Sequence, residues 1–297
     1  MGMQSVSIIG VGRIGGALAI ALSRAGFAVD MLVHRDDSTA KLIAPHLPNT
    51  TRFVEWSSRQ SPFESDIVLI TTADPDIASV AEALPDQLKK GSVVMHTSGS
   101  LSSESLSALA DAGHFTAAMH PLVSVSDAIS GADNFSGAFF CIEGSDEALK
   151  EARGIVQALG GRAFSIETSK KTLYHAAAVT ACGHLVALID IAIEMLSKCG
   201  IDKAAAKEIL LPLITSTIAN LEKESPEQAL TGSFARLDAD AIERHLSAID
   251  RDMSDQVKDV YLLLGERSLE LAALNNENAA GVQKVRELIS IAKRKPG

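Results

Sequence analysis

Cysteine is scarce in this sequence, and the few cysteines are scattered. The 297 residues include three, Cys141, Cys182 and Cys199, and no two of them have the close spacing of a metal-binding pair. This usage argues against a disulfide framework and against a zinc site, so we expect no metal. Free cysteines are typical of a reducing compartment, and we therefore expect a cytoplasmic protein.

The sequence also lacks any long basic run. It has 27 lysines and arginines against 37 aspartates and glutamates, which gives a formal net charge of -10. Nucleic acids and anionic membranes select positive surfaces, so we expect neither as a partner. An anionic small molecule would need cations that the fold places next to it.

No apolar run is free of polar groups over the length of a membrane span. The longest one, from Ala176 to Ile193, contains His184 and Asp190, and it predicts a buried helix instead. A helix that is apolar on nearly every side must be covered on every side. We expect a second subunit to provide part of that cover in a symmetric homodimer.

Strand and helix signals alternate in the first half of the chain, and only helix signals follow. Short apolar runs such as "SVSIIG" and "DIVLITT" predict strands, and periodic segments such as "RIGGALAIALSRAG" predict the helices between them. From about Thr168 onward every periodic segment is helical. We therefore predict an α/β Rossmann domain over residues 1–167 and an all-α substrate and dimerisation domain over residues 168–297.

A glycine-rich turn joins the first predicted strand to the first predicted helix. Gly10, Gly12 and Gly15 have the spacing G-x-G-x-x-G. In such turns the first glycine permits the tight bend, the second lets the backbone approach a pyrophosphate, and the third lets the helix pack closely on the strand. The turn predicts a dinucleotide site to which Arg13 and Ile14 also contribute. A turn with only a structural role is the alternative.

The acidic residue that usually ends the next strand of such a site is missing. In NAD sites it binds the adenosine ribose about 20 residues after the motif, and here that offset from Gly15 falls on His34 and Arg35. A carboxylate would repel a 2′-phosphate, whereas an arginine binds one through a charge-assisted contact. The sequence thus favours NADP over NAD, unless Arg35 is only a solvated surface residue. Asp36 and Asp37 are expected to cap the next helix.

Polar residues follow several later strands, at the edge where an open α/β sheet places its ligands. Thr72 and Asp74 follow the third predicted strand and are expected to border the cofactor. Ser98 and His120 follow later strands and are candidates for the nicotinamide pocket, with Ser98 on the cofactor side and His120 on the substrate side. His96, at the end of the strand before Ser98, is a further candidate. As alternatives, Asp74 can cap a helix, and a lone histidine can be a packed core or surface residue.

The first helix of the second half carries the candidates for proton transfer. In "KKTLYHAAAVTACGHLVAL", Lys171 and His175 are four residues apart and share a face, to which Cys182 returns. At about 100° per residue, His184 lies on the opposite side from His175. Reduction of a C=O or C=N bond requires a proton donor near the developing anion, and Lys171 or His175 is the expected catalytic acid. A solvated lysine and a packed histidine are the alternative.

Several longer motifs resemble a family of Rossmann-like oxidoreductases whose helical C-terminal domain has no assigned function. These motifs are "HTSGSL", "HPL", "LYHAAAV", "LPLITSTIANL" and "ALTGSFARLDADAIERHL", and the resemblance extends over nearly the whole chain. The first domain is also similar to deazaflavin-dependent NADP oxidoreductases, pyrroline-5-carboxylate reductase and ketopantoate reductase. The resemblance implies an NADP-type Rossmann domain, a helical dimerisation domain and an active site between them.

The chain departs from the pattern of that family at two places. The family usually has Ser-Asn where this chain has Cys182–Gly183, which removes a hydrogen-bonding amide from the expected substrate side. It also has Thr-Gly-Pro and Arg-Gly-Asp where this chain has Thr-Gly-Ser at 231–233 and Arg-Leu-Asp at 236–238. Arg236 is retained and is the candidate for binding a substrate carboxylate. An ion pair between Arg236 and Asp238 is the alternative.

These features together predict an NADP(H)-dependent oxidoreductase that reduces a small oxo- or imino-acid by hydride transfer. Lys171 or His175 would act as the acid, Arg236 would bind the anionic group of the substrate, and His120 and Cys182 would line the substrate side. The alternative is a protein that binds or senses NADP without turnover.

Overall fold

The computed structural model describes residues 4–59 and 61–294, so the outermost residues of both predicted domains lie outside the described part. The chain divides into two compact units, Met1–Gly183 and His184–Gly297. The first unit has an α/β fold, and the described residues of the second contain only helices. The helix α7 (Lys171–Ala181), which we assigned to the second domain from the sequence, belongs to the first unit.

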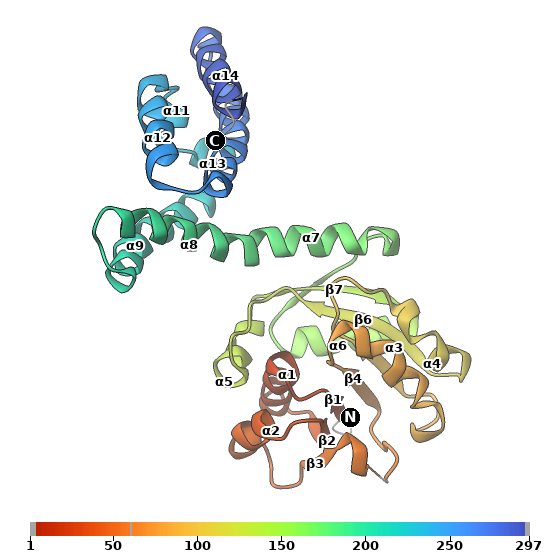
Figure 1. Cartoon of the computed structure of the whole chain (residues 1–297). Coiled ribbons are helices and arrows are strands. Elements are labelled where there is room, and N and C mark those ends of the chain that lie inside the picture. The colour runs from red at the N-terminus through yellow and green to blue at the C-terminus, as the bar shows by residue number, and fades with distance from the viewer. Residues whose placement is uncertain (1–3, 60, 295–297) are drawn as a thin grey trace. The chain divides into compact units, whose positions relative to one another are not determined.

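A single eight-stranded sheet forms the centre of the first unit (Figure 1). The strand order is β3-β2-β1-β4-β5-β6-β7-β8, and the neighbours are parallel except for β6 and β7. The first six strands have the order 3-2-1-4-5-6 that is typical of dinucleotide-binding folds. The strands are β1 (Ser5–Ile9), β2 (Ala28–His34), β3 (Arg52–Glu55), β4 (Ile67–Ile70), β5 (Val93–His96), β6 (Phe115–Pro121), β7 (Phe139–Gly144) and β8 (Arg162–Phe164).

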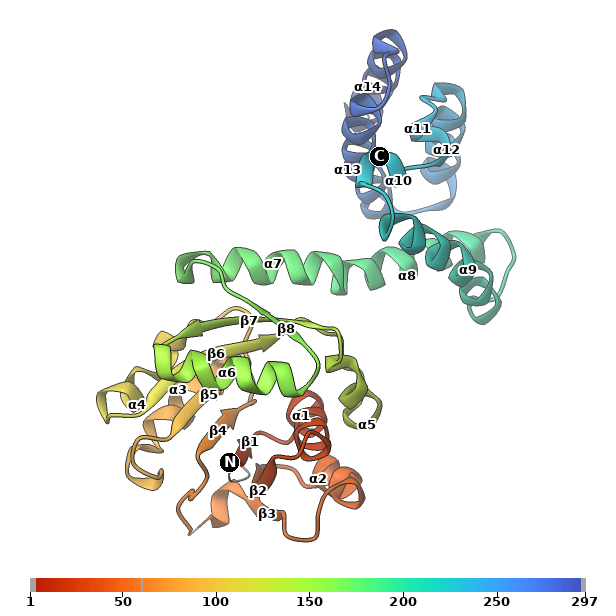
Figure 2. The ribbon, with the colours of Figure 1, turned by 180° about the vertical axis from the view of Figure 1, so that it is seen from behind.

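Helices cover both faces of this sheet. Figure 1 views the face under α3 and α4, and Figure 2 views the opposite face, under α6. Besides α7, the helices of this unit are α1 (Arg13–Arg24), α2 (Ser38–Ile43), α3 (Asp74–Glu82), α4 (Ser107–Asp111), α5 (Ala128–Gly131) and α6 (Asp146–Ala158). Short 3-10 turns are η1 (Ala44–His46), η2 (Trp56–Ser58), η3 (Pro85–Gln87), η4 (Ser103–Leu106), η5 (Ala132–Phe135) and η6 (Thr168–Lys170).

The central strands are apolar because both of their faces are buried. Side chains of a strand alternate between the two faces of the sheet, and β4 shows this directly. Ile67 and Leu69 join the apolar cluster that contains residues of α1 and α6, whereas Val68 and Ile70 join the cluster that contains residues of α3 and α4. A continuous apolar run of this kind is typical of a parallel sheet that is covered on both sides.

The strand order reverses between β1 and β4, and this point determines where a ligand can bind. The two strands pair in parallel, so their carboxyl ends lie together, with Ile9 opposite Ile70. Gly10 follows β1, and Thr71 and Thr72 follow β4. Open α/β sheets hold ligands outside the carboxyl ends of their strands at such a reversal. The fold therefore brings the glycine turn and the residues after β4 to one edge of the sheet.

The helices after α7 are α8 (Gly183–Lys198), α9 (Lys203–Leu221), α10 (Pro226–Ala229), α11 (Gly232–Ala235), α12 (Ala239–Asp252), α13 (Asp255–Leu274) and α14 (Ala279–Arg294). The core of the second unit lies between the last three. There Ile242 of α12, Leu262 of α13 and Val285 of α14 are buried in one apolar cluster. Helix α12 begins at a side-chain cap, because the Asp238 carboxylate accepts a hydrogen bond from the Ala241 amide.

The apolar segment that we expected to be buried is exposed in the single chain. The helix Thr168–Lys198, which includes α7 and α8, is long and apolar enough to cross a membrane by length and composition, a test that core helices of soluble proteins also pass. None of its most apolar window is buried. The prediction of burial is therefore wrong for one chain by itself. Helix α9 is exposed in the same way, with Leu213 63% exposed.

Candidate cofactor and substrate site

The glycine turn has the geometry that a dinucleotide requires. Gly10 has φ +103°, in the left-handed region that favours glycine, and a Cβ there would lie 2.7 Å from the Thr72 amide nitrogen. A Cβ on Gly15 would lie 2.0 Å from the carbonyl oxygen of Gly10, so α1 packs directly on the turn. A Cβ on Gly12 would meet nothing within 4 Å. The second glycine therefore borders open space, where a phosphate can approach the backbone.

A pocket of 320 Å³ lies beside this turn, at the carboxyl ends of β1, β2 and β4. Its lining includes Gly10, Gly12, His34, Arg35 and Thr72. Two of its buried polar atoms, His34 Nδ1 and Thr72 Oγ1, have no hydrogen-bond partner within the described residues. Buried polar groups are normally paired, so these atoms fit a polar ligand. The residues present thus fit a bound dinucleotide.

Arg35 lines this pocket together with a carboxylate that the sequence did not single out. Its Nη1 donates a hydrogen bond to Oδ2 of Asp76 in α3, at 2.9 Å. The side chains of Arg35 and Asp76 are 63% and 33% exposed. An ion pair as solvated as this one contributes little to stability. The guanidinium is therefore held loosely at the edge of the pocket.

Some of the residues predicted to contact the cofactor do not line this pocket. Arg13 is exposed at the start of α1, and Ile14 packs against the apolar core. The acids after Arg35 lie at the start of α2, where the predicted capping is met only in part, because the side chain of the N-cap residue makes no capping hydrogen bond. Asp36 accepts a hydrogen bond from the backbone amide of Ser38, and Asp37 is the N-cap residue of α2.

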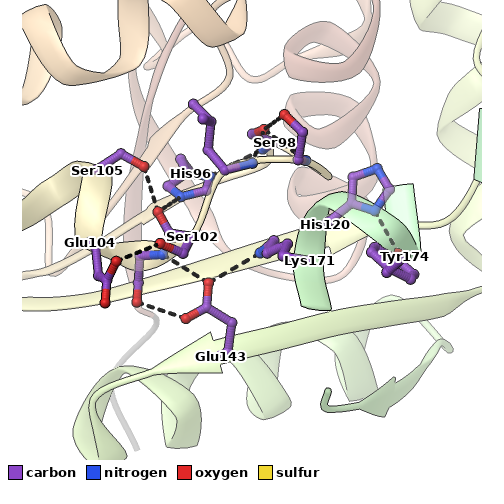
Figure 3. A network of polar contacts seen from close by, with 12 residues as sticks. His96, Ser98, Ser102, Glu104, Ser105, His120, Glu143, Lys171 and Tyr174 are labelled. Carbon is purple, nitrogen blue, oxygen red and sulfur yellow. Dashed lines mark hydrogen bonds and ion pairs between the residues drawn. The ribbon is translucent and has the colours of Figure 1, made fainter. Parts of the chain in front are cut away.

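The polar residues after β4 and β5 bind mainly to one another. Asp74 accepts a hydrogen bond from Ser100 Oγ at 2.6 Å, and Ser98 Oγ accepts one from the backbone amide three residues later. His96 is fully buried, and its Nε2 donates to the Ser102 carbonyl at 2.9 Å while its Nδ1 accepts from the Ser98 amide (Figure 3). Burial lowers the pKa of His96. This histidine is therefore a neutral, structural residue.

A second group brings β6, the loop after β5 and α7 together. His120 Nδ1 and Tyr174 Oη are 2.7 Å apart (Figure 3), and the ring centroids of His120 and His175 are 5.8 Å apart. A Cβ on Gly99 would lie 2.4 Å from His175 Nδ1 and 2.8 Å from His120 Nε2. Gly99 thus allows the loop to pass beside both imidazole rings.

Burial sets the protonation of this group. Burial, together with the nearby His175 and Lys171, lowers the pKa of His120 to about 4, so the ring is neutral near pH 7. Burial also raises the pKa of Tyr174, so the phenol keeps its proton and donates it to His120 Nδ1. The ring proton of His120 is then on Nε2. His175 Nδ1 is buried without a hydrogen-bond partner among the described residues.

The same group lines a second, larger pocket of 620 Å³. His120, Tyr174 and His175 contribute aromatic and imidazole rings, and Cys182 lies at the end of α7. The rest of the lining is mostly apolar and consists of Leu122, Val123, Ser124, Ala177, Ala178, Val179, Ala181 and Gly183. Within the described residues no lysine or arginine lines this pocket. It can hold the apolar part of a small molecule next to imidazole nitrogens.

Lys171 is not among the residues that line this pocket. Its Nζ lies 3.1 Å from Oε1 of Glu143 in β7, and the two side chains are 2% and 8% exposed (Figure 3). The same carboxylate accepts hydrogen bonds from the backbone amide and the hydroxyl of Ser103 in η4, each at 2.8 Å. The buried pair joins the start of α7 to β7 and η4. Lys171 therefore has a structural role in this arrangement.

The second unit contains Arg236, the predicted ligand for a carboxylate. Arg236 is exposed at the end of α11. The alternative that it pairs with Asp238 is wrong, because the Asp238 side chain caps α12 instead. Leu237, between them, has φ +54°, a conformation that few non-glycine residues adopt. The guanidinium of Arg236 remains available to an anion.

Family models match most of the chain. A model of a Rossmann-like domain matches residues 2–121. A model of a domain of unknown function, DUF2520, matches residues 138–268. No curated protein matches the chain in sequence.

Solved structures of three other proteins share the fold. A Bacteroides fragilis protein assigned provisionally as an NADP oxidoreductase has a TM-score of 0.75 at 22% identity, over 90% of this chain and 98% of its own. An imine reductase from Pseudomonas sp. has a TM-score of 0.60 at 16% identity, over 92% and 98%. A reductive aminase from Aspergillus terreus has a TM-score of 0.63 at 13% identity, over 98% and 99%.

These likenesses confirm the predicted order of an α/β Rossmann domain and a helical region. At such low identities they establish the fold and leave the substrate open. The chain carries a Rossmann-like domain followed by the domain of unknown function DUF2520.

Proposed function

We propose that this chain is an NADP(H)-dependent oxidoreductase that reduces a C=O or C=N bond of a small oxo- or imino-acid. The observation that best supports the proposal is that one compact unit contains both the dinucleotide pocket and the His120–Tyr174–His175 group. One related fold belongs to a reductive aminase whose structure is a complex with NADPH and ethyl levulinate. NADPH supplies a hydride when it is bound, and the protein must then supply a proton.

The residues of the first pocket bind different parts of the cofactor in this proposal. The open backbone at Gly12 and the first amides of α1 face the pyrophosphate. Arg35, at the end of β2, binds the 2′-phosphate of the adenosine ribose. The unpartnered atoms His34 Nδ1 and Thr72 Oγ1 hydrogen-bond to polar groups of the same ligand.

We propose His175 as the proton donor. The sequence left Lys171 and His175 as alternatives, and the ammonium of Lys171 is buried against Glu143. His175 Nδ1, in contrast, has no partner within the described residues and lies beside Gly99. His120 is neutral near pH 7 because of its low pKa of about 4, so it donates a hydrogen bond from Nε2 and orients the atom that receives the proton.

The pocket beside His175 also bears on the substrate. Its apolar lining suits a short carbon skeleton, but its described residues include no cation for a carboxylate. An oxo- or imino-acid needs such a cation, and Arg236 remains our proposed one because its guanidinium is exposed and unpaired within the described residues. Cys182, at the end of α7, is proposed to contact the same substrate.

A panel of substrates tests the proposed reaction. We expect loss of NADPH absorbance with at least one 2-oxo acid or cyclic imino acid, and slower or no turnover with the matched neutral ketone or imine. Turnover of the neutral compounds alone would contradict the role of Arg236. Binding of NADPH without oxidation by any compound would instead support the alternative, a protein that senses the nucleotide.

We also propose that a second copy of the chain covers the exposed apolar helices. Monomeric proteins rarely leave large continuous apolar surfaces in water, because burial stabilises by about 25 cal/mol for each Å². The exposed large apolar side chains of α8 and α9 are Leu185, Val186, Leu188, Ile209, Leu211, Leu213, Ile218 and Leu221. A chain with net charge -10 and no basic run is poorly suited to an anionic lipid surface.

Light scattering at micromolar concentration should therefore give twice the chain mass of 31.2 kDa. Replacing Ile209 and Leu213 on α9 together by glutamate should give a single chain, since both side chains are exposed in the single chain and the proposed dimer would have to bury the new charges. Leu274→Glu, at an exposed position outside these helices, is the matched control and should leave the dimer intact. A monomeric parent protein, or one extracted only by detergent, would contradict the proposal.

A further inference from the structure

We infer that Asp76 limits the preference of this site for NADP over NAD. The inference rests on the proposed cofactor and concerns the adenosine end of the first pocket. Arg35 follows β2 and Asp76 lies in the first turn of α3, which follows β4. Strands β2 and β4 flank β1 in the sheet. The 2.9 Å ion pair therefore crosses the end of β1, where the strand order reverses.

The charges around this end of the pocket are unfavourable to a further anion. Among the described lining residues, Arg35 is the only lysine or arginine, and Asp36 and Asp76 are both acidic. Asp36 is bound to the amide of Ser38. Asp76 is bound to Arg35, the one lysine or arginine among the described lining residues. The guanidinium thus already has a carboxylate partner before a nucleotide arrives.

A 2′-phosphate must compete with Asp76 for Arg35. The phosphate carries a charge between about -1.5 and -2 at neutral pH, and its contact with a guanidinium is stronger than an exposed ion pair. The phosphate is therefore expected to displace Asp76. The displaced carboxylate stays nearby, because its backbone is fixed at the start of α3. At about 5 Å in solvent, the repulsion should weaken NADP binding roughly 3- to 20-fold.

NAD does not compete with Asp76 for Arg35. It carries no 2′-phosphate, so Asp76 does not have to move away. A carboxylate beside the adenosine ribose can accept hydrogen bonds from its hydroxyls, which is the role of the acid that the end of β2 lacks. Helix α3 thus supplies from another part of the chain the carboxylate that is missing after β2.

Calorimetric titration of NADPH and NADH tests the inference in the full-length protein. Asp76→Asn should bind NADPH roughly 3- to 20-fold more tightly than the parent, because it removes the competing charge. Its NADH affinity should stay the same or fall. Arg35→Ala should lose roughly 10- to 150-fold in NADPH affinity and almost none in NADH affinity, because it removes the contact itself.

The matched control is Glu82→Gln. It removes one negative charge from an exposed position on the same helix, away from the pocket, and both affinities should stay within about twofold of the parent's because solvent screens a distant charge. An unchanged or weaker NADPH affinity in Asp76→Asn, or an equal gain for both nucleotides, would overturn the inference and leave the proposed function standing. A parent protein that bound neither nucleotide would contradict the proposed function itself.

Discussion

Replacing His175 by alanine is expected to lower turnover about 10²- to 10⁴-fold, the usual contribution of a general acid. The imidazole has a buried, unpartnered Nδ1 beside the loop after β5, and it lines the apolar pocket. It does not line the dinucleotide pocket. NADPH affinity should therefore stay close to that of the parent protein, so that kcat falls and binding does not.

The matched control for this variant is His184→Ala, at the other histidine of the helix Thr168–Lys198. His184 is exposed and lies outside the pocket that His175 lines, so its replacement should leave turnover unchanged. Turnover would be followed by NADPH absorbance with the best substrate of the panel, and a thermal melt would check that each variant is folded. Normal turnover in a folded His175→Ala protein would remove this residue from the chemistry.

Lys171→Met should lower the free energy of unfolding by about 3–5 kcal/mol, which is the usual effect of removing one partner of a buried ion pair. The variant leaves the Glu143 carboxylate buried without a cation, although the two hydrogen bonds from Ser103 remain. Denaturant unfolding followed by circular dichroism measures this change. Lys170→Met replaces the exposed neighbouring lysine and should alter stability by less than about 0.5 kcal/mol.

A second substitution separates the structural role of Lys171 from a catalytic one. Glu143→Gln in the Lys171→Met background removes the orphaned charge, and its amide can still bond to Ser103, so part of the lost stability should return. A catalytic lysine would give another result. Near-normal stability in Lys171→Met with a loss of turnover of 10²-fold or more would restore Lys171 as the acid.

The fold could be predicted because its signals are local. Strand and helix patterns alternate along the first half of the chain, and the three glycines occur at one turn. There Gly10 and Gly15 each have a steric reason, whereas Gly12 borders open space. The strand order then follows from the usual topology of such chains. The helical region could be predicted for the same reason. The exposure of α8 and α9 in the single chain could not be predicted, because a periodic pattern shows that the apolar face of a helix must be buried but does not show what buries it.

The site was only partly predictable, because its contacts join distant parts of the chain. Arg35 was found from its distance to the glycine turn, yet Asp76 is 41 residues further along and nothing local relates the two. His120 and Tyr174 are 54 residues apart, and Tyr174 was missed although it stands next to His175. Glu143 had one usable signal, a lone charge within the apolar strand "FFCIEG".

The buried pair of Lys171 and Glu143 has a consequence for how the polypeptide can be divided. Residues up to 167 look like a finished Rossmann domain in sequence, but a fragment that ended there would lack Lys171, the counter-ion of the Glu143 carboxylate. It would also deprive His120 of the phenol that fixes its tautomer. The boundary between the two compact units comes after α7, at Gly183. By its sequence pattern, α7 begins the helical half of the chain. Its side chains Lys171 and Tyr174 nevertheless bond to β7 and β6, so it completes the first unit.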